Sequence, residues 1–210
     1  MNSLKQTRRL LVSSGALLMT MVSVRFAHSQ GTFVYDQQSA TNTGLGGSDF
    51  VFQSFQPMGQ SFTPAFDSIG FVQLKLVDFS LDGVGASVFV NLRENSITGN
   101  VLAASSPTFM KDGFQGITNF FFSPSSPLIP GTTYYLQPVL QSGDPGLELI
   151  GDHYNYPGGT AFFLGAASPS DTDLWFREGY FVPEPSSAIL LLIGGGFLFL
   201  HRRRKSQSAP

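Results

Sequence analysis

Short apolar runs alternate with groups of Gly, Pro, Ser, Asn and Asp throughout residues 30–185 of this chain. In residues 69–77, one face carries Val72, Leu74 and Leu76, and the other carries Phe71, Gln73, Lys75 and Val77. In residues 87–93, Val88, Val90 and Leu92 are opposed to Phe89, Asn91 and Arg93. This period of two predicts half-buried strands.

Further strands are expected wherever Phe, Val, Tyr and Ile gather between turn residues. They are residues 31–36, 59–63, 101–105, 117–122, 133–140, 147–150, 160–164 and 173–177. No stretch of this region carries an apolar stripe of helical period. We therefore predict an all-β domain over residues 30–181, an antiparallel β-sandwich or jelly roll. An N-terminal signal helix and a short C-terminal transmembrane helix are expected to flank it.

Residues 1–29 have the three parts of a secretory signal peptide. Lys5, Arg8 and Arg9 form a positive start, and residues 10–24 are apolar. Ala27 and Ser29 then supply small side chains at the −3 and −1 positions of a cleavage site. The apolar part is short for the roughly 20 residues of a stable membrane anchor. The sequence leaves the choice between general secretion and the twin-arginine route open.

The other end of the chain has a second tripartite pattern. Pro183-Glu184-Pro185 is followed by an uncharged apolar run over residues 188–200, and then by Arg202, Arg203, Arg204 and Lys205. Residues 186–200 span only about 22 Å as a helix, against a hydrocarbon core of roughly 30 Å. Snorkelling cations and local bilayer thinning can make up the difference. The cations favour a cytoplasmic C-terminus.

This arrangement resembles the PEP-CTERM sorting signal of exported bacterial proteins, over residues 182–205, with residues 206–210 as a cytoplasmic tail. The resemblance implies that an exosortase, a membrane-embedded protease, recognises Pro183, Glu184 and Pro185 and removes the segment. It also implies a retention role for the basic cluster. The released protein is then expected at the cell surface or outside the cell, often with exopolysaccharide.

Charge is divided unevenly along the chain. The whole sequence has 12 basic and 14 acidic residues, a formal net charge of −2. Residues 30–185 contain four of the basic and all 14 acidic residues, which gives −10. An acidic domain repels phosphate backbones, so a nucleic-acid partner is not expected.

The strand and turn sequence between the two sorting segments resembles β-sandwich modules of bacterial surface proteins with a choice of C-terminal anchors. The similarity lies in residues 59–63, 88–94, 128–135 and 173–177. Those modules are similar in outline to carbohydrate-binding jelly rolls. This resemblance implies a fold more than a function.

Catalytic signatures are scarce. The chain has no cysteine, and removal of both terminal segments leaves His153 as its single histidine. A histidine-rich metal site is then impossible, and a Ser-His-Asp triad would have to use His153, which no nucleophile elbow accompanies. A pair of glycosidase carboxylates cannot be identified among 14 acids. We expect a non-enzymatic protein.

Two binding hypotheses remain open. Tyr154, Tyr156 and Trp175, helped by Asp152 and Asn155, are candidates for an aromatic platform on which sugars stack. The other interpretation places Trp175 in the core, since it lies in an alternating strand.

Asp171 with Asp173, or Asp78 with Asp82, are candidates for a structural calcium site, although isolated loop aspartates usually cap turns. No other cofactor is expected.

The sequence therefore predicts an exported envelope protein with a structural or matrix-associated β-sandwich. Its expected partners are the export machinery, an exosortase and, through residues 186–200, the membrane. A carbohydrate-binding module for exopolysaccharide is the alternative. The two differ in one measurable respect, because only the module should bind a glycan array.

Overall fold

The computed structural model describes residues 31–44 and 46–182, in which residues Phe33–Phe181 form one compact unit. This part of the chain contains strands and no helix. The expected signal helix and C-terminal helix lie outside the described residues. The strands are β1 (Thr32–Gln38), β2 (Ser48–Val51), β3 (Gly59–Phe62), β4 (Ser68–Val77), β5 (Ala86–Glu94), β6 (Val101–Ala104), β7 (Thr108–Met110), β8 (Gln115–Pro127), β9 (Tyr134–Gly143), β10 (Glu148–Asp152), β11 (Ala161–Phe163), β12 (Ala166–Ala167), β13 (Asp173–Leu174) and β14 (Phe176–Val182).

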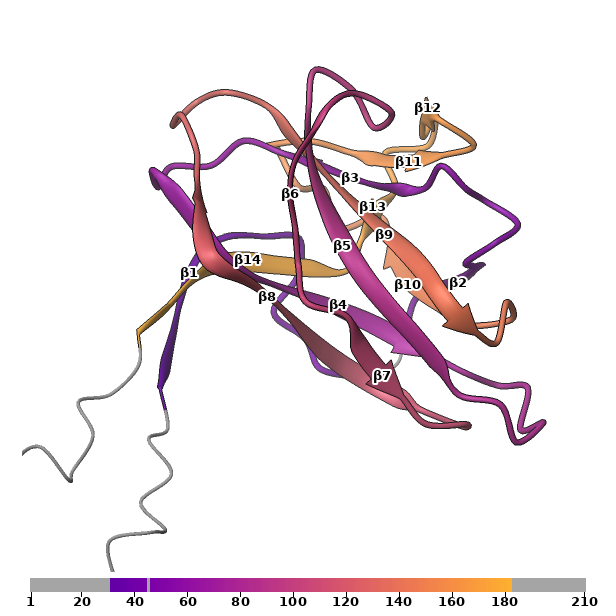
Figure 1. Ribbon diagram of the computed structural model, residues 1–210. Coiled ribbons are helices and arrows are strands. Elements are labelled where there is room, and N and C mark those ends of the chain that lie inside the picture. The colour runs from indigo at the N-terminus through magenta and orange to yellow at the C-terminus, as the bar shows by residue number, and fades with distance from the viewer. Residues whose placement is uncertain (1–30, 45, 183–210) are drawn as a thin grey trace, which may run out of the picture. The chain divides into compact units, whose positions relative to one another are not determined.

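The strands form two antiparallel sheets of seven strands each (Figure 1). The first sheet has the order β1-β14-β4-β10-β13, with β8 also paired to β4 and β2 to β10. The second has the order β12-β11-β3-β9-β5-β6, with β7 also paired to β5. The predicted all-β, antiparallel sandwich class is confirmed.

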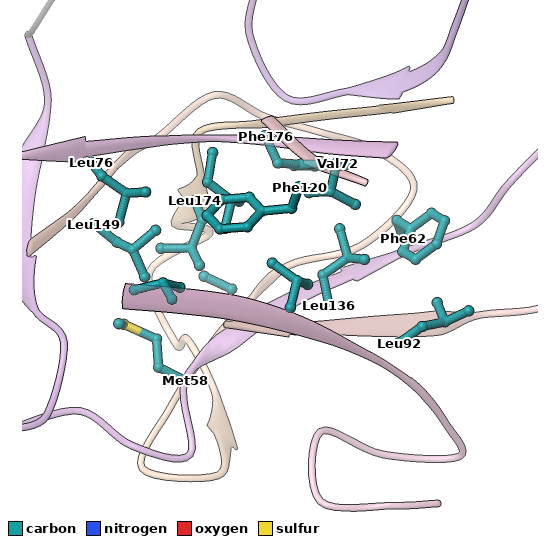
Figure 2. Close-up of a cluster of buried hydrophobic side chains, with 14 of the residues drawn as sticks. Met58, Phe62, Val72, Leu76, Leu92, Phe120, Leu136, Leu149, Leu174 and Phe176 are labelled. Atoms are coloured by element: carbon teal, nitrogen blue, oxygen red, sulfur yellow. The ribbon is translucent and has the colours of Figure 1, made fainter. Parts of the chain in front are cut away.

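The core lies between the sheets, where their apolar faces meet. Figure 2 shows Val72, Leu76, Phe120 and Phe176 from the first sheet opposite Leu136 and other side chains from the second. The strands predicted at residues 69–77 and 87–93 are confirmed as β4 and β5. One predicted face of each strand is buried in this cluster, with six side chains: Val72, Leu74, Leu76, Val88, Val90 and Leu92.

The expectation that β4 is only half-buried is wrong. Its opposite face is covered as well, and Phe71, Lys75 and Val77 are fully buried. Phe71 lies against the rings of Phe33 and Tyr35 from β1. Both faces of β4 are therefore buried, because additional chain segments pack on the outer face of the first sheet.

Three short strands, β2, β7 and β12, were not predicted. The expected strand 173–177 divides at Trp175 into β13 and β14, and β14 continues to Val182. β2 illustrates the cause: its residues Ser48 and Asp49 are polar, and it is a strand because it pairs with β10 at the register Asp49↔Ile150. Such pairing depends on a distant segment and leaves no local period.

Candidate functional site

The last strand of the sheet leads directly into the sorting segment. β14 is an inner strand between β1 and β4, and it ends at Val182, which is 44% exposed. Pro183 and Pro185 lack the N–H group that a strand would use to continue the ladder. The last strand that the structure describes ends at the residue before the Pro-Glu-Pro motif.

Most of the predicted sorting residues lie outside the described part of the chain. They are Ala27, Ser29, Pro183, Glu184, Pro185, Arg202, Arg203, Arg204 and Lys205. Within the described residues, no helix has the length and apolar character needed to cross a membrane.

The start and the end of the β domain lie side by side (Figure 1). The backbone N–H of Ser39 donates to the Phe176 carbonyl at 3.0 Å, and the rings of Phe33 and Phe181 are 5.2 Å apart. These contacts place β1 antiparallel to β14. The beginning of β1 and the end of β14 therefore lie at the same end of the first sheet.

Five aromatic side chains gather at this end, on the outer face of the first sheet. We call them the terminal aromatic cluster: Phe33, Tyr35, Phe71, Phe121 and Phe181. Phe33 is central, with ring centroids 4.7 Å from Phe71 and 6.1 Å from Phe121. Phe71 is fully buried, whereas Tyr35 and Phe121 remain 40% and 37% exposed.

The predicted sugar platform is not an exposed surface. Trp175 is fully buried, and its indole Nε1 donates to the Asn42 carbonyl at 2.9 Å. Lys75 Nζ and the Arg177 guanidinium lie 4.9 Å and 4.7 Å from its ring. The alternative interpretation, in which Trp175 is buried, is the correct one. The Trp175 side chain packs on the outer face of the first sheet, under residues 39–44.

Tyr156 is also removed from the surface. It packs edge-on against Phe176 at 5.2 Å, and its hydroxyl donates to Gln37 Oε1 at 3.0 Å. Burial raises the pKa of this hydroxyl strongly. Tyr154 is half-buried, and Asp152 accepts a hydrogen bond from the backbone of exposed His153. The three rings thus do not form the expected platform, because two of them fill internal space.

Asp171 and Asp173 line a small polar depression of about 210 Å³, together with Asn155, Tyr156, Gly159 and Thr160. The Asp173 carboxylate is already engaged, since it accepts 2.9 Å hydrogen bonds from Gln60 Nε2 and the Tyr156 backbone. Its burial raises its pKa. Among the described residues, no group of three or more acidic, histidine or cysteine side chains is placed to hold a metal ion.

The second candidate pair for calcium has a local role in the structure. Asp78 accepts hydrogen bonds from the backbone and hydroxyl of Ser80, and Asp82 accepts one from the Val84 backbone. These are the turn-capping contacts expected of isolated loop aspartates. Calcium binding at either pair stays a prediction.

One pair of acids was missed by the sequence analysis. Glu178 is fully buried, and burial together with the nearby Asp36 carboxylate raises the pKa of Glu178 to about 9. Its Oε1 accepts from the Gln37 backbone at 3.1 Å. Asp36 Oδ2 accepts 2.8 Å hydrogen bonds from the backbones of Ala65 and Phe66. The sequence does contain a signal for the burial of Glu178. Glu178 is two residues after Phe176, so both side chains lie on the same face of β14.

This pair is suited to structure more than to acid–base chemistry. Glu178 has no solvent exposure, so a dissolved substrate cannot reach it without local unfolding. A neutral carboxyl is the favoured form there, because an isolated charge is expensive to bury.

Comparison with known proteins identifies the C-terminal motif. None of the curated proteins compared with the chain is significantly similar to it. Residues 181–205 match the family model of the PEP-CTERM protein-sorting motif, which confirms the signal predicted at residues 182–205 and supports an exported protein that an exosortase processes.

Proposed function

We propose that this chain is an exported, non-catalytic β-sandwich that is held at the outer face of the membrane until an exosortase removes its C-terminal segment. One observation carries the proposal: the matched sorting motif begins at Phe181, within the last strand. A complete folded domain is thus joined to the signal without an intervening domain. The apolar run 188–200 serves as the anchor.

The charges of the two ends support an orientation with the β domain outside. Arg202, Arg203, Arg204 and Lys205 retain the C-terminus in the cytoplasm. The signal peptide is removed after Ser29, so the domain is linked to the membrane through residues 183–187 alone.

After processing, the domain serves a structural or matrix-associated role. The internal hydrogen bonds of Asp173 and the burial of Glu178 support a non-catalytic domain. A carbohydrate-binding module loses the support of Tyr156 and Trp175, since neither ring is free to stack on a sugar.

Intact-mass measurement in the native host tests the proposal. The secreted or surface protein is expected to begin after Ser29 and to lack residues 186–210. A triple variant, Pro183→Ala, Glu184→Ala and Pro185→Ala, should keep the tail. Ser206→Ala with Ser208→Ala is the matched control, because both lie beyond the matched residues. A mature wild-type protein that retains residues 186–210 beside an active exosortase would contradict the proposal.

A further inference from the structure

We propose that the terminal aromatic cluster docks on the lipid–water interface of the membrane while the chain is anchored. The inference rests on the proposed function, because it needs residues 188–200 in the bilayer. It adds a second contact with the membrane, made by the folded domain itself.

The anchor is tied closely to the cluster. Phe181 belongs to the cluster, and the apolar run begins at Ala188, six residues after Val182. Six residues reach at most about 20 Å when fully extended. A domain of this size is about 40 Å wide, from the usual relation between chain length and radius of gyration. The end of the first sheet that carries the cluster is therefore held beside the bilayer.

The cluster has the composition of an interfacial contact. Phe side chains gain by entering the boundary between headgroups and acyl chains, and the hydroxyl of Tyr35 can stay hydrated there. None of the five rings carries a charge, and the Arg177 guanidinium lies 5.6 Å from the centre of the Tyr35 ring. The cluster is thus apolar on a domain, residues 30–181, that has four basic and 13 acidic residues and a formal charge of −9.

Further apolar surface surrounds the end of β14. Tyr180, 36% exposed, packs on Phe66 with ring centroids 5.4 Å apart. Both line an open depression of about 550 Å³ with Ala65 and Pro130, in which Asp67 supplies the one charged side chain. Ile129, next to Pro130, is 66% exposed. Apolar side chains therefore flank the point at which the chain leaves the domain, as an interfacial contact requires.

The absence of cysteine makes a direct test possible. The mature chain with its tail is placed one copy per phosphatidylcholine nanodisc, and a fluorophore is attached to Phe121→Cys or, as an independent variant, Tyr35→Cys. Leu81→Cys is the matched control, since Leu81 is 74% exposed and follows β4 at the other end of the sheet. Circular dichroism and thermal unfolding establish that each labelled variant is folded.

A nitroxide lipid labelled near its headgroup should quench most of the fluorescence at position 121 or 35 and little at position 81. Equal quenching at both ends would overturn the docking proposal. So would a label at position 121 that is shielded from lipid and from a water-soluble quencher alike, because the chain itself would then cover the cluster. A chain that does not remain with the nanodisc contradicts the proposed function instead.

A longer linker separates docking from simple proximity. Inserting about 20 Gly and Ser residues between Pro185 and Ser186 adds a reach of roughly 25 Å. A cluster with affinity for the interface stays docked, since tethering keeps its local concentration high. Loss of the quenching at position 121 in this variant would show that the linker alone held it there and would overturn the proposal.

Discussion

At the scale of single residues, Glu178 is the most perturbed acid described in this protein. Its carboxyl lies in the interior beside Asp36, and its Oε2 has no hydrogen-bond partner among the described residues. Because burial and the neighbouring carboxylate both disfavour the charge, the folded protein holds the proton at neutral pH. The unfolded chain releases it near the ordinary value for glutamate.

This difference predicts a loss of stability as pH rises. A raised pKa in the folded state gives a contribution that is complete below the unfolded value of about 4.3 and is lost as the pH approaches about 9. Glu178 alone can lower the free energy of unfolding by up to about 1.4 kcal/mol per pH unit in this window. Urea unfolding between pH 5 and 9 measures it.

Glu178→Gln is the matched variant, because the amide keeps the shape of a neutral carboxyl without a titratable proton. Its free energy of unfolding should depend less on pH than that of the wild type. Parallel pH dependences of the two proteins would show that Glu178 does not hold its proton in the folded state.

At the scale of elements, β4 is the strand whose environment departs most from its sequence pattern. Lys75 is fully buried on its outer face, where Nζ donates to the Gly44 carbonyl and lies over Trp175. Burial and the charge of Arg177 lower the pKa of this lysine. Arg177 Nε also donates to the Ala40 carbonyl at 3.1 Å. Residues 39–44 are thus held on the sheet by side chains of β4, Trp175 and β14.

We expect Lys75→Ala to destabilise the protein by about 2–4 kcal/mol, because it leaves a cavity beneath residues 39–44. Lys75→Met should cost less, under about 1.5 kcal/mol, since it keeps the volume and removes a buried charge. The Gly44 carbonyl is at an exposed residue and can bind water instead. Lys111→Ala, at an exposed position, is the control, and chemical unfolding gives all three values. A methionine variant as unstable as the alanine variant would mean that the charge, not the volume, is essential.

At the scale of the whole molecule, basic residues are concentrated in the two terminal segments and acidic residues in the region between them. Eight of the 12 basic residues lie in residues 1–29 and 186–210, and all 14 acids lie in residues 30–185. Removing both segments should therefore change the formal charge from −2 to about −10. A high net charge of one sign keeps an exported domain soluble.

Isoelectric focusing can follow this change. The precursor has an expected isoelectric point of about 5.8, and the processed protein should focus at a clearly lower value. The full-length precursor, made by cell-free synthesis without export, provides the reference. A mature protein that focuses with the precursor would show that the basic ends are retained.

Features that are local along the chain follow from the amino-acid sequence alone. The period of two in residues 69–77 and 87–93 identified strands and divided their side chains between two faces, because alternate side chains of a strand point to opposite sides. The sorting signal could also be predicted from the sequence, since its motif, apolar run and basic cluster follow one another along the chain and are recognised by residue type.

The segments that cover each face of the first sheet are known from the three-dimensional structure. Trp175 and Lys75 are buried because residues 39–44 cross the outer face of the sheet, and Glu178 is buried where β14 pairs with β1. The Gln37–Glu178 hydrogen bond joins residues 141 positions apart. The terminal aromatic cluster likewise combines β1, β4, β8 and β14. Such juxtapositions follow from strand order, which local periodicity does not encode.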